Sequence, residues 1–163
     1  IKSSAASDVY KRQEVLPHYL KEDQYRWYLL AYEENVLKTF SVDCIIDPQI
    51  LYGKTFKRNM DIDINSLFKD CYGIWNQTNI PIEEIELSYS PLDGNFLKSV
   101  PLHHSQEIIV DDEKEFRIKL HLRITNDFVM ALLSRSRSLT VIKPLHLREQ
   151  VKAIYEEALK RNR

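Results

Sequence analysis

The chain has 163 residues and a formal net charge of -1, and 44% of its residues are hydrophobic and 29% charged. This composition is typical of a folded protein with one ordinary domain or two small ones, and it excludes an intrinsically disordered chain. The three glycines are too scattered to form a phosphate-binding glycine loop. Because the net charge is near zero, any contact with nucleic acid has to come from a local patch of basic residues.

The sequence contains no recognisable catalytic or metal-binding motif. His103 and His104 are adjacent, so on a strand they would point to opposite faces, and the other histidines have no ligand at a suitable spacing. Cys44 and Cys71 lack a CxxC spacing, and we expect both to be buried in a reduced, cytoplasmic protein. We therefore predict no enzyme, no metal and no cofactor. No apolar run approaches the ~18 residues of a membrane span, so no membrane contact is predicted.

Residues 1–13, IKSSAASDVYKRQ, show no amphipathic period. We expect them to be a non-native or disordered lead-in, such as translated adapter sequence, and a natural flexible segment is the alternative. The corollary is that the chain is a fragment that lacks a natural N-terminal part.

Paired strands are predicted directly after this lead-in. A short strand through residues 18–20 is followed by a polar turn at 21–24 and by a strong strand, RWYLLAY, at 26–32. A turn at residues 33–35 leads into a second strand, at 36–46, which completes a hairpin.

The strand RWYLLAY has two distinct faces, because successive side chains of a strand point in opposite directions. We expect Trp27 and Leu29 to lie in the core. The two sets are Arg26, Tyr28, Leu30 and Tyr32 on one face, and Trp27, Leu29 and Ala31 on the other.

The middle of the chain has weaker signals. Residues 49–62 show no clear period but contain a basic cluster, which consists of Lys54, Lys57 and Arg58. A short helix is predicted between Asn65, which can cap it, and Gly73, which can end it. The polar loop at 75–81 is the expected domain boundary.

The second half predicts an α+β domain with the order βαββαβα. Its strands are expected at 82–90, 102–111, 115–124 and 139–144, and its helices within 91–100, from Asn126 and from Leu147. In the last helix an apolar stripe is expected to face inward, and it consists of Val151, Ile154, Tyr155, Ala158 and Leu159.

The hairpin RWYLLAYEENVLKTFSVDCI, residues 26–45, resembles the WYL domain of bacterial transcriptional regulators, which is named after the tripeptide Trp27, Tyr28 and Leu29. The second half is similar to the C-terminal extension of these regulators, the WCX domain, in the segments LHHSQEI, FVMALLS, LTVIKP and LREQVKAIYEEALK. The ordered set covers nearly all of residues 15–163, which makes it more specific than the tripeptide alone.

The resemblance implies an α+β chain with an incomplete Sm-like or SH3-like small β-barrel, the partial WYL domain, at residues 14–64. A short helix and linker follow at 65–82, and the WCX domain occupies 83–163. In the family the barrel senses a ligand, which is single-stranded nucleic acid in some members, and the extension helps to form dimers. Operator DNA would be bound by an N-terminal helix-turn-helix domain that this chain lacks.

The function that this implies is the ligand-sensing and dimerisation half of a transcriptional regulator. The expected partners are a second copy of the chain, as a homodimer, and an effector that is a single-stranded nucleic acid, a nucleotide or another anionic ligand. The alternative is a purely structural dimerisation module with a degenerate ligand pocket.

The candidate ligand-binding residues are Arg26, Tyr28, Tyr32 and Ser41. One cation and two aromatic rings suit phosphate binding and base stacking. The alternative is a hairpin with one core face and one amphipathic face. Two arginines of the family fall on Ser41 and Cys44 here, and neither side chain can form bidentate phosphate contacts, so we expect weak affinity.

A second candidate is the basic stripe, which consists of Arg117, Lys119, His121 and Arg123 on one face of a predicted strand. Such a stripe could follow a phosphate backbone. The alternative is an ordinary solvated sheet face, partly neutralised by the acidic residues within 111–115.

Overall fold

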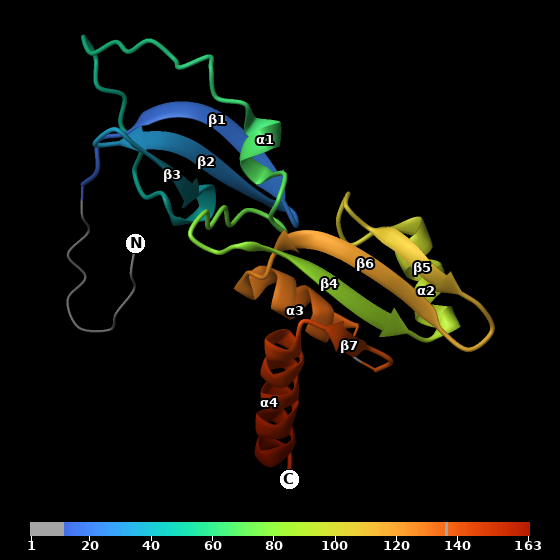
Figure 1. Cartoon of the computed structure of the whole chain (residues 1–163). Helices are drawn as coiled ribbons and strands as arrows, with labels where there is room; N and C mark the ends of the chain where they lie inside the picture. Colours follow the sequence, from blue (N-terminus) through green and yellow to red (C-terminus); the bar gives the residue numbers. More distant parts are fainter. Residues whose placement is uncertain (1–11, 136) are drawn as a thin grey trace. The chain divides into compact units, whose positions relative to one another are not determined.

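The computed structural model describes residues 12–135 and 137–163. The predicted lead-in therefore lies almost wholly outside the described residues. The described chain is a mixed α+β structure with two antiparallel sheets and four α-helices (Figure 1), as the sequence predicts for the fold class. It divides into two compact units between Asp63 and Ile64. None of the helices in the described part of the chain is long and apolar enough to cross a membrane.

The first unit contains a three-stranded antiparallel sheet, here called the first sheet. Its strands follow the order β1 (Leu16–Asp23), β2 (Arg26–Glu33) and β3 (Val36–Ser41), and a 3-10 helix, η1 (Val42–Cys44), ends β3. Among the described residues the sheet does not close into a barrel.

Two-residue turns join these strands. Gln24 and Tyr25 link β1 to β2, Glu34 and Asn35 link β2 to β3, and all four have positive φ. This is the geometry of a type I′ hairpin turn, which matches the twist of the strands that it joins. The polar run at 21–24 was predicted to be a turn, but β1 continues to Asp23 because the turn needs only two residues.

The core of the first unit is small. Leu30 and Ala31 are its buried apolar residues in the described part of the chain. The prediction that Trp27 lies in the core is wrong, because its side chain is 52% exposed. Trp27 lies beside the β1–β2 turn, opposite Glu22, at an end of the sheet that is left uncovered. Leu29 is partly buried.

The second unit begins with α1 (Ile64–Phe68) and contains a four-stranded antiparallel sheet, here called the second sheet. The strands are β4 (Ile82–Tyr89), β5 (Glu107–Asp111), β6 (Phe116–Arg123) and β7 (Thr140–Lys143), and the helices are α2 (Pro91–Ser99), α3 (Asn126–Ser134) and α4 (Leu145–Arg161). The strand order in the sheet is β5-β6-β4-β7, and the helices follow β4, β6 and β7 along the chain. This is the split βαβ arrangement of ferredoxin-like domains with one added helix.

The hydrophobic core of the second unit lies between one face of the second sheet and its helices. The alternation predicted for β6 is confirmed, since Phe116, Ile118, Leu120 and Leu122 are fully buried. They pack against apolar residues of β4 and of the helices, namely Ile85, Leu87, Leu97, Phe128 and Leu132. Side-chain caps fix the helix starts, because Ser90 accepts from the Asp93 N–H and Thr125 from the Phe128 N–H.

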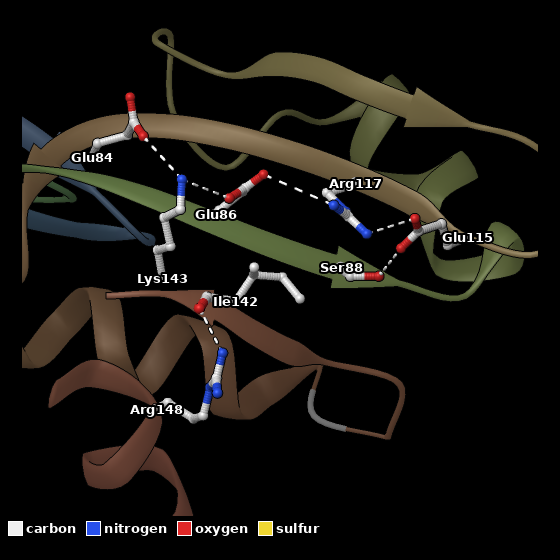
Figure 2. A network of polar contacts seen from close by, with 8 residues as sticks. All are labelled: Glu84, Glu86, Ser88, Glu115, Arg117, Ile142, Lys143 and Arg148. Atoms are coloured by element: carbon white, nitrogen blue, oxygen red, sulfur yellow. Dashed lines mark hydrogen bonds and ion pairs between the residues drawn. The ribbon is translucent and has the colours of Figure 1, made fainter. Parts of the chain in front are cut away.

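The final helix, α4, is fastened to the sheet only at its beginning. Leu147 and Val151 are buried, and the Arg148 guanidinium donates to the Val141 carbonyl of β7 at 2.7 Å. It also donates to the Ile142 carbonyl at 2.6 Å (Figure 2). The prediction that Tyr155 and Leu159 face inward is wrong, since they are 36% and 56% exposed. Ile154 still packs against the core, whereas the side of the second half that carries Tyr155 and Leu159 is exposed.

The segment after α3 is held against α2 by Asp93. Arg137 Nη2 donates to Asp93 Oδ1 at 2.9 Å, and the hydroxyl groups of Ser138 and Ser90 donate to Oδ2. The hydrogen bonds from Arg137 and Ser138 lower the pKa of Asp93 from 3.8 to about 2, although burial opposes them. The Asp93 carboxylate is therefore charged in the folded protein, and its bond with Arg137 stabilises the packing against α2.

Replacing Gly94 by alanine should destabilise the second unit. A Cβ at this position would lie 2.4 Å from Phe116 Cγ and 2.5 Å from Phe116 Cβ, and this buried ring has no room to move. We expect a loss of roughly 1–3 kcal/mol in the free energy of unfolding in urea, although a helical Gly→Ala change normally gains about 1 kcal/mol. Asn95→Ala, at an exposed position of the same helix, is the control. A stabilised Gly94→Ala protein would contradict the close packing of α2 on β6.

Acid should remove the stabilisation from Asp93. Its pKa is lowered in the folded protein, so the contribution is complete above pH 3.8 and is lost as the pH falls towards 2. The free energy of unfolding of the wild type should therefore fall more over this interval than that of Asp93→Asn. The exposed carboxylate variant Glu113→Gln should follow the wild type. Parallel curves for wild type and Asp93→Asn would show that the contact contributes nothing.

Candidate functional site

The first sheet gathers the predicted ligand-binding residues on one face. Arg26, Tyr28, Leu30 and Tyr32 alternate along β2, and Ser41 of β3 is directly opposite Tyr28. Directly opposed residues of antiparallel strands share a face. We call this surface the Arg26 face. Arg26 is exposed, whereas Tyr28, Tyr32 and Ser41 are partly buried and Leu30 is buried beneath them.

At the far end of this face, Tyr32 belongs to a small aromatic cluster. Its ring meets the edge of His18 at a centroid distance of 4.9 Å, and His18 meets Phe56 at 5.5 Å. His18 is the extra residue of a β-bulge in β1. Packing therefore occupies Tyr32, and the open part of the Arg26 face is formed by Arg26, Tyr28 and Ser41.

Hydrogen bonds to both ring nitrogens hold His18 in place. Nδ1 lies 2.8 Å from the Leu16 carbonyl oxygen and so carries the proton, while Nε2 accepts from the backbone N–H of Asn59 at 3.0 Å. The ring is buried, and through these bonds it fastens the coil around Asn59 to the sheet.

This coil brings a second arginine to the Arg26 face. The Arg58 guanidinium lies over the Tyr19 ring, 4.9 Å from its centroid, and the Tyr19 hydroxyl donates to the Ile62 carbonyl at 3.4 Å. Tyr19 is opposite Leu30 in the β1–β2 register, so its ring is on the same face as Tyr28. The sequence shows the basic cluster that contains Arg58. It does not show that Arg58 contacts Tyr19, because this contact depends on the tertiary structure.

Two charged residues of β1 also lie on the Arg26 face. Lys21 is opposite Tyr28, and Asp23 is opposite Arg26. Neither residue is among the predicted site residues, because the polar run at 21–24 was predicted to be a turn. A two-residue turn would have placed both by alternation. Burial raises the pKa of Asp23, and the charge of Lys21 opposes that rise.

The Arg26 face therefore carries more positive than negative charge. Lys21, Arg26 and Arg58 are its cations, and Asp23 is the acid that the strand register places among them. The rings of Tyr19 and Tyr28 lie between these groups. Guanidinium groups bind phosphate oxygens in pairs, and tyrosine rings stack on bases, so the surface suits an anionic ligand with planar rings.

The basic stripe on β6 has a different character. Its four residues share the face opposite the core, as predicted, but each has a partner. Figure 2 shows one part of this network, in which Glu86 lies between Arg117 and Lys143. The partners of the stripe are Glu115 for Arg117 at 2.8 Å, Glu107 for Lys119 at 2.9 Å, Glu84 for His121 at 3.6 Å and the Ile80 carbonyl for Arg123.

Acidic residues of β4 and β5 thus alternate with the basic residues of β6 across the second sheet. Exposed ion pairs of this kind contribute little to stability, but they cancel the local charge. This arrangement favours the alternative interpretation, a solvated sheet face, over a track for a phosphate backbone.

The adjacent histidines belong to a turn that is fastened to β6. His103 and His104 lie in a turn before β5 rather than on a strand, and their rings are 4.1 Å apart. Ser105 fastens this turn, because its hydroxyl donates to the His121 carbonyl and accepts from the His121 N–H. Within the described ranges no group of three metal-ligating side chains comes together. Cys71 is buried, but Cys44 is exposed in the turn η1, contrary to the prediction.

No protein-family model matches the chain, and no curated protein matches it significantly. Among solved structures, the chain is similar to Proteasome accessory factor B/C (PafBC) of Arthrobacter aurescens, with 18% sequence identity and a TM-score of 0.33. The match covers 85% of this chain and 21% of that chain, so the chain spans about a fifth of the length of PafBC.

Proposed function

We propose that the chain is the ligand-sensing and dimerisation part of a cytoplasmic WYL-type transcriptional regulator. In this proposal the first sheet belongs to a small barrel of the Sm or SH3 type, and residues 83–163 are the WCX domain. The effector is a single-stranded nucleic acid, a nucleotide or another anionic ligand bound on the Arg26 face. The observation that carries the proposal is that Lys21, Arg26 and Arg58 lie on the face of the sheet that also carries Tyr19 and Tyr28.

In this proposal the residues of the Arg26 face have different roles in ligand binding. Tyr28 stacks on a base, since its ring is partly exposed, and Arg26 and Arg58 bind the flanking phosphates. Ser41, opposite Tyr28, can donate one hydrogen bond to the same ligand. Because Arg58 comes from a coil and Arg26 from a strand, a ligand that binds both restricts the coil. That restriction is the step by which binding would shift the population of regulator states.

The second half of α4 is the proposed dimer contact. Tyr155 and Leu159 are exposed apolar residues on a helix whose first half is firmly packed. Pairing with α4 of a second copy would cover them. This assignment of the dimer contact follows the resemblance of the second half to the WCX domain.

A short single-stranded oligonucleotide should bind the wild type with marked salt dependence. Arg26→Ala and Arg58→Ala should each weaken binding at low salt and reduce the slope of log Kd against log salt by about 1. Tyr28→Ala should cost roughly 1–3 kcal/mol through lost stacking, with little change in slope. Ser41→Arg should strengthen binding. Fluorescence anisotropy at several salt concentrations measures all of these effects.

Lys119→Ala is the matched control, because it removes a cation whose charge Glu107 already balances. It should leave both affinity and slope unchanged. No binding even at low salt, together with no gain from Ser41→Arg, would favour the alternative function, a structural dimerisation module with a degenerate pocket.

Self-association should depend on α4. Sedimentation velocity of the wild type should show dimers that increase with concentration, and Leu159→Glu should shift the protein to monomer because a buried carboxylate would oppose pairing. Ala153→Glu places the same charge at an exposed position of α4 and should behave as the wild type. A wild type that stays monomeric at high concentration would refute the dimer contact.

A further inference from the structure

A second group of arginines lies in the second unit, at the end of α3. Arg135 is the C-terminal cap of α3, and Arg137 follows in the same segment. With Asp93 and Phe96 of α2, and Ser134, they line an open hollow of about 350 Å³. This volume is at the low end of the range of about 300–1,000 Å³ for small-molecule sites. A mononucleotide or a smaller ligand fits this size, and an oligonucleotide does not.

The one acid of the hollow is already neutralised. Arg137 binds both carboxylate oxygens of Asp93, through Nε at 3.3 Å and Nη2 at 2.9 Å. Ser138 and Ser90 donate to the same carboxylate. The negative charge of Asp93 is therefore balanced by Arg137, and the charge of Arg135 remains for a ligand.

Arg135 has no such acceptor. Its guanidinium lies 5.5 Å from the centroid of the Phe96 ring, and no acceptor among the described residues lies within hydrogen-bonding distance of it. A contact with a ring face leaves the N–H groups at the edge of the guanidinium available. Phe96 is itself 53% exposed, so part of its ring is open to a ligand.

We propose that this hollow binds a small aromatic phosphate, with the phosphate on Arg135 and the aromatic ring against Phe96. Arg135 offers a planar pair of donors that matches two phosphate oxygens. Phe96 offers an exposed ring for stacking. The site is separate from the Arg26 face, and it does not depend on the function proposed for that face.

The competing interpretation is that both arginines only fasten the segment after α3 to α2. Arg137 has that role, because losing it would leave Asp93 buried without its cation. For Arg135 the structural interpretation rests on one ring contact at the surface. The two views differ in what removal of Arg135 does to ligand binding.

Phenyl phosphate is the probe, with inorganic phosphate and phenol as comparisons, and binding is followed by NMR of backbone amides and arginine Nε–H groups. Phenyl phosphate should bind more tightly than inorganic phosphate, phenol should not bind, and the signals of Phe96 and Arg135 should shift. Arg135→Ala should weaken phenyl phosphate binding about tenfold, as expected for the loss of charge-assisted hydrogen bonds. Arg135→Lys should have an intermediate effect, because the charge stays but the planar donors are lost.

Two controls locate the effect. Arg163→Ala removes an exposed cation near the end of the chain and should change nothing. Lys152→Ala, at an exposed position of α4, should also leave phenyl phosphate binding unchanged. The proposal is overturned if phenyl phosphate causes no shifts at Phe96 and Arg135, or if Arg163→Ala weakens binding as much as Arg135→Ala does.

Discussion

The register of the first sheet determines which side chains can act together in the candidate site. Gln24 and Tyr25 form one two-residue turn and Glu34 and Asn35 the other, and each requires positive φ at both positions. Such turns fix the register of the strands that they join. A slip by one residue would move Arg26 and Tyr28 to the opposite face and replace them by Trp27 and Leu29. The residues proposed to bind a ligand are therefore placed by the turns, and only secondarily by their own contacts.

The two sheets show how the same residue types can have opposite electrostatic effects. On the second sheet, strand neighbours alternate in sign, so Lys119 lies beside Glu107 and His121 beside Glu84. The field of such a surface falls off rapidly with distance. On the Arg26 face, the register places Lys21 and Arg26 on one side of the sheet, and Asp23 is the acid among them. The coil adds Arg58 over the Tyr19 ring. A chain of net charge -1 can thus present a local positive patch.

Alternation along a strand was predictable wherever a complete core covered one face. The β6 pattern of Phe116, Ile118, Leu120 and Leu122 was assigned correctly, because each residue has a full layer of helix above it. The same rule failed for Trp27, which lies near the end of a small sheet with little to cover it. It failed again for Leu159, because an amphipathic stripe does not tell where the partner surface ends. Periodicity reports which face is apolar, and tertiary structure decides how much of that face is buried.

The sequence predicts only those parts of the candidate site that follow from local patterns. Arg26, Tyr28 and Ser41 follow from alternation and from the hairpin, which are local properties. Arg58 does not, because it reaches Tyr19 through a coil without regular structure that the buried His18 ring holds in place. No local pattern encodes a contact between residues so far apart in the sequence.

The most direct test of the central claim is an NMR titration of the whole chain with a short single-stranded oligonucleotide at low salt. If the Arg26 face is the binding surface, the largest shifts should appear at Lys21, Tyr28, Ser41 and Arg58, with little change at Lys119 and His121. Shifts that are strongest along β6, or spread evenly over every exposed basic residue, would contradict the account.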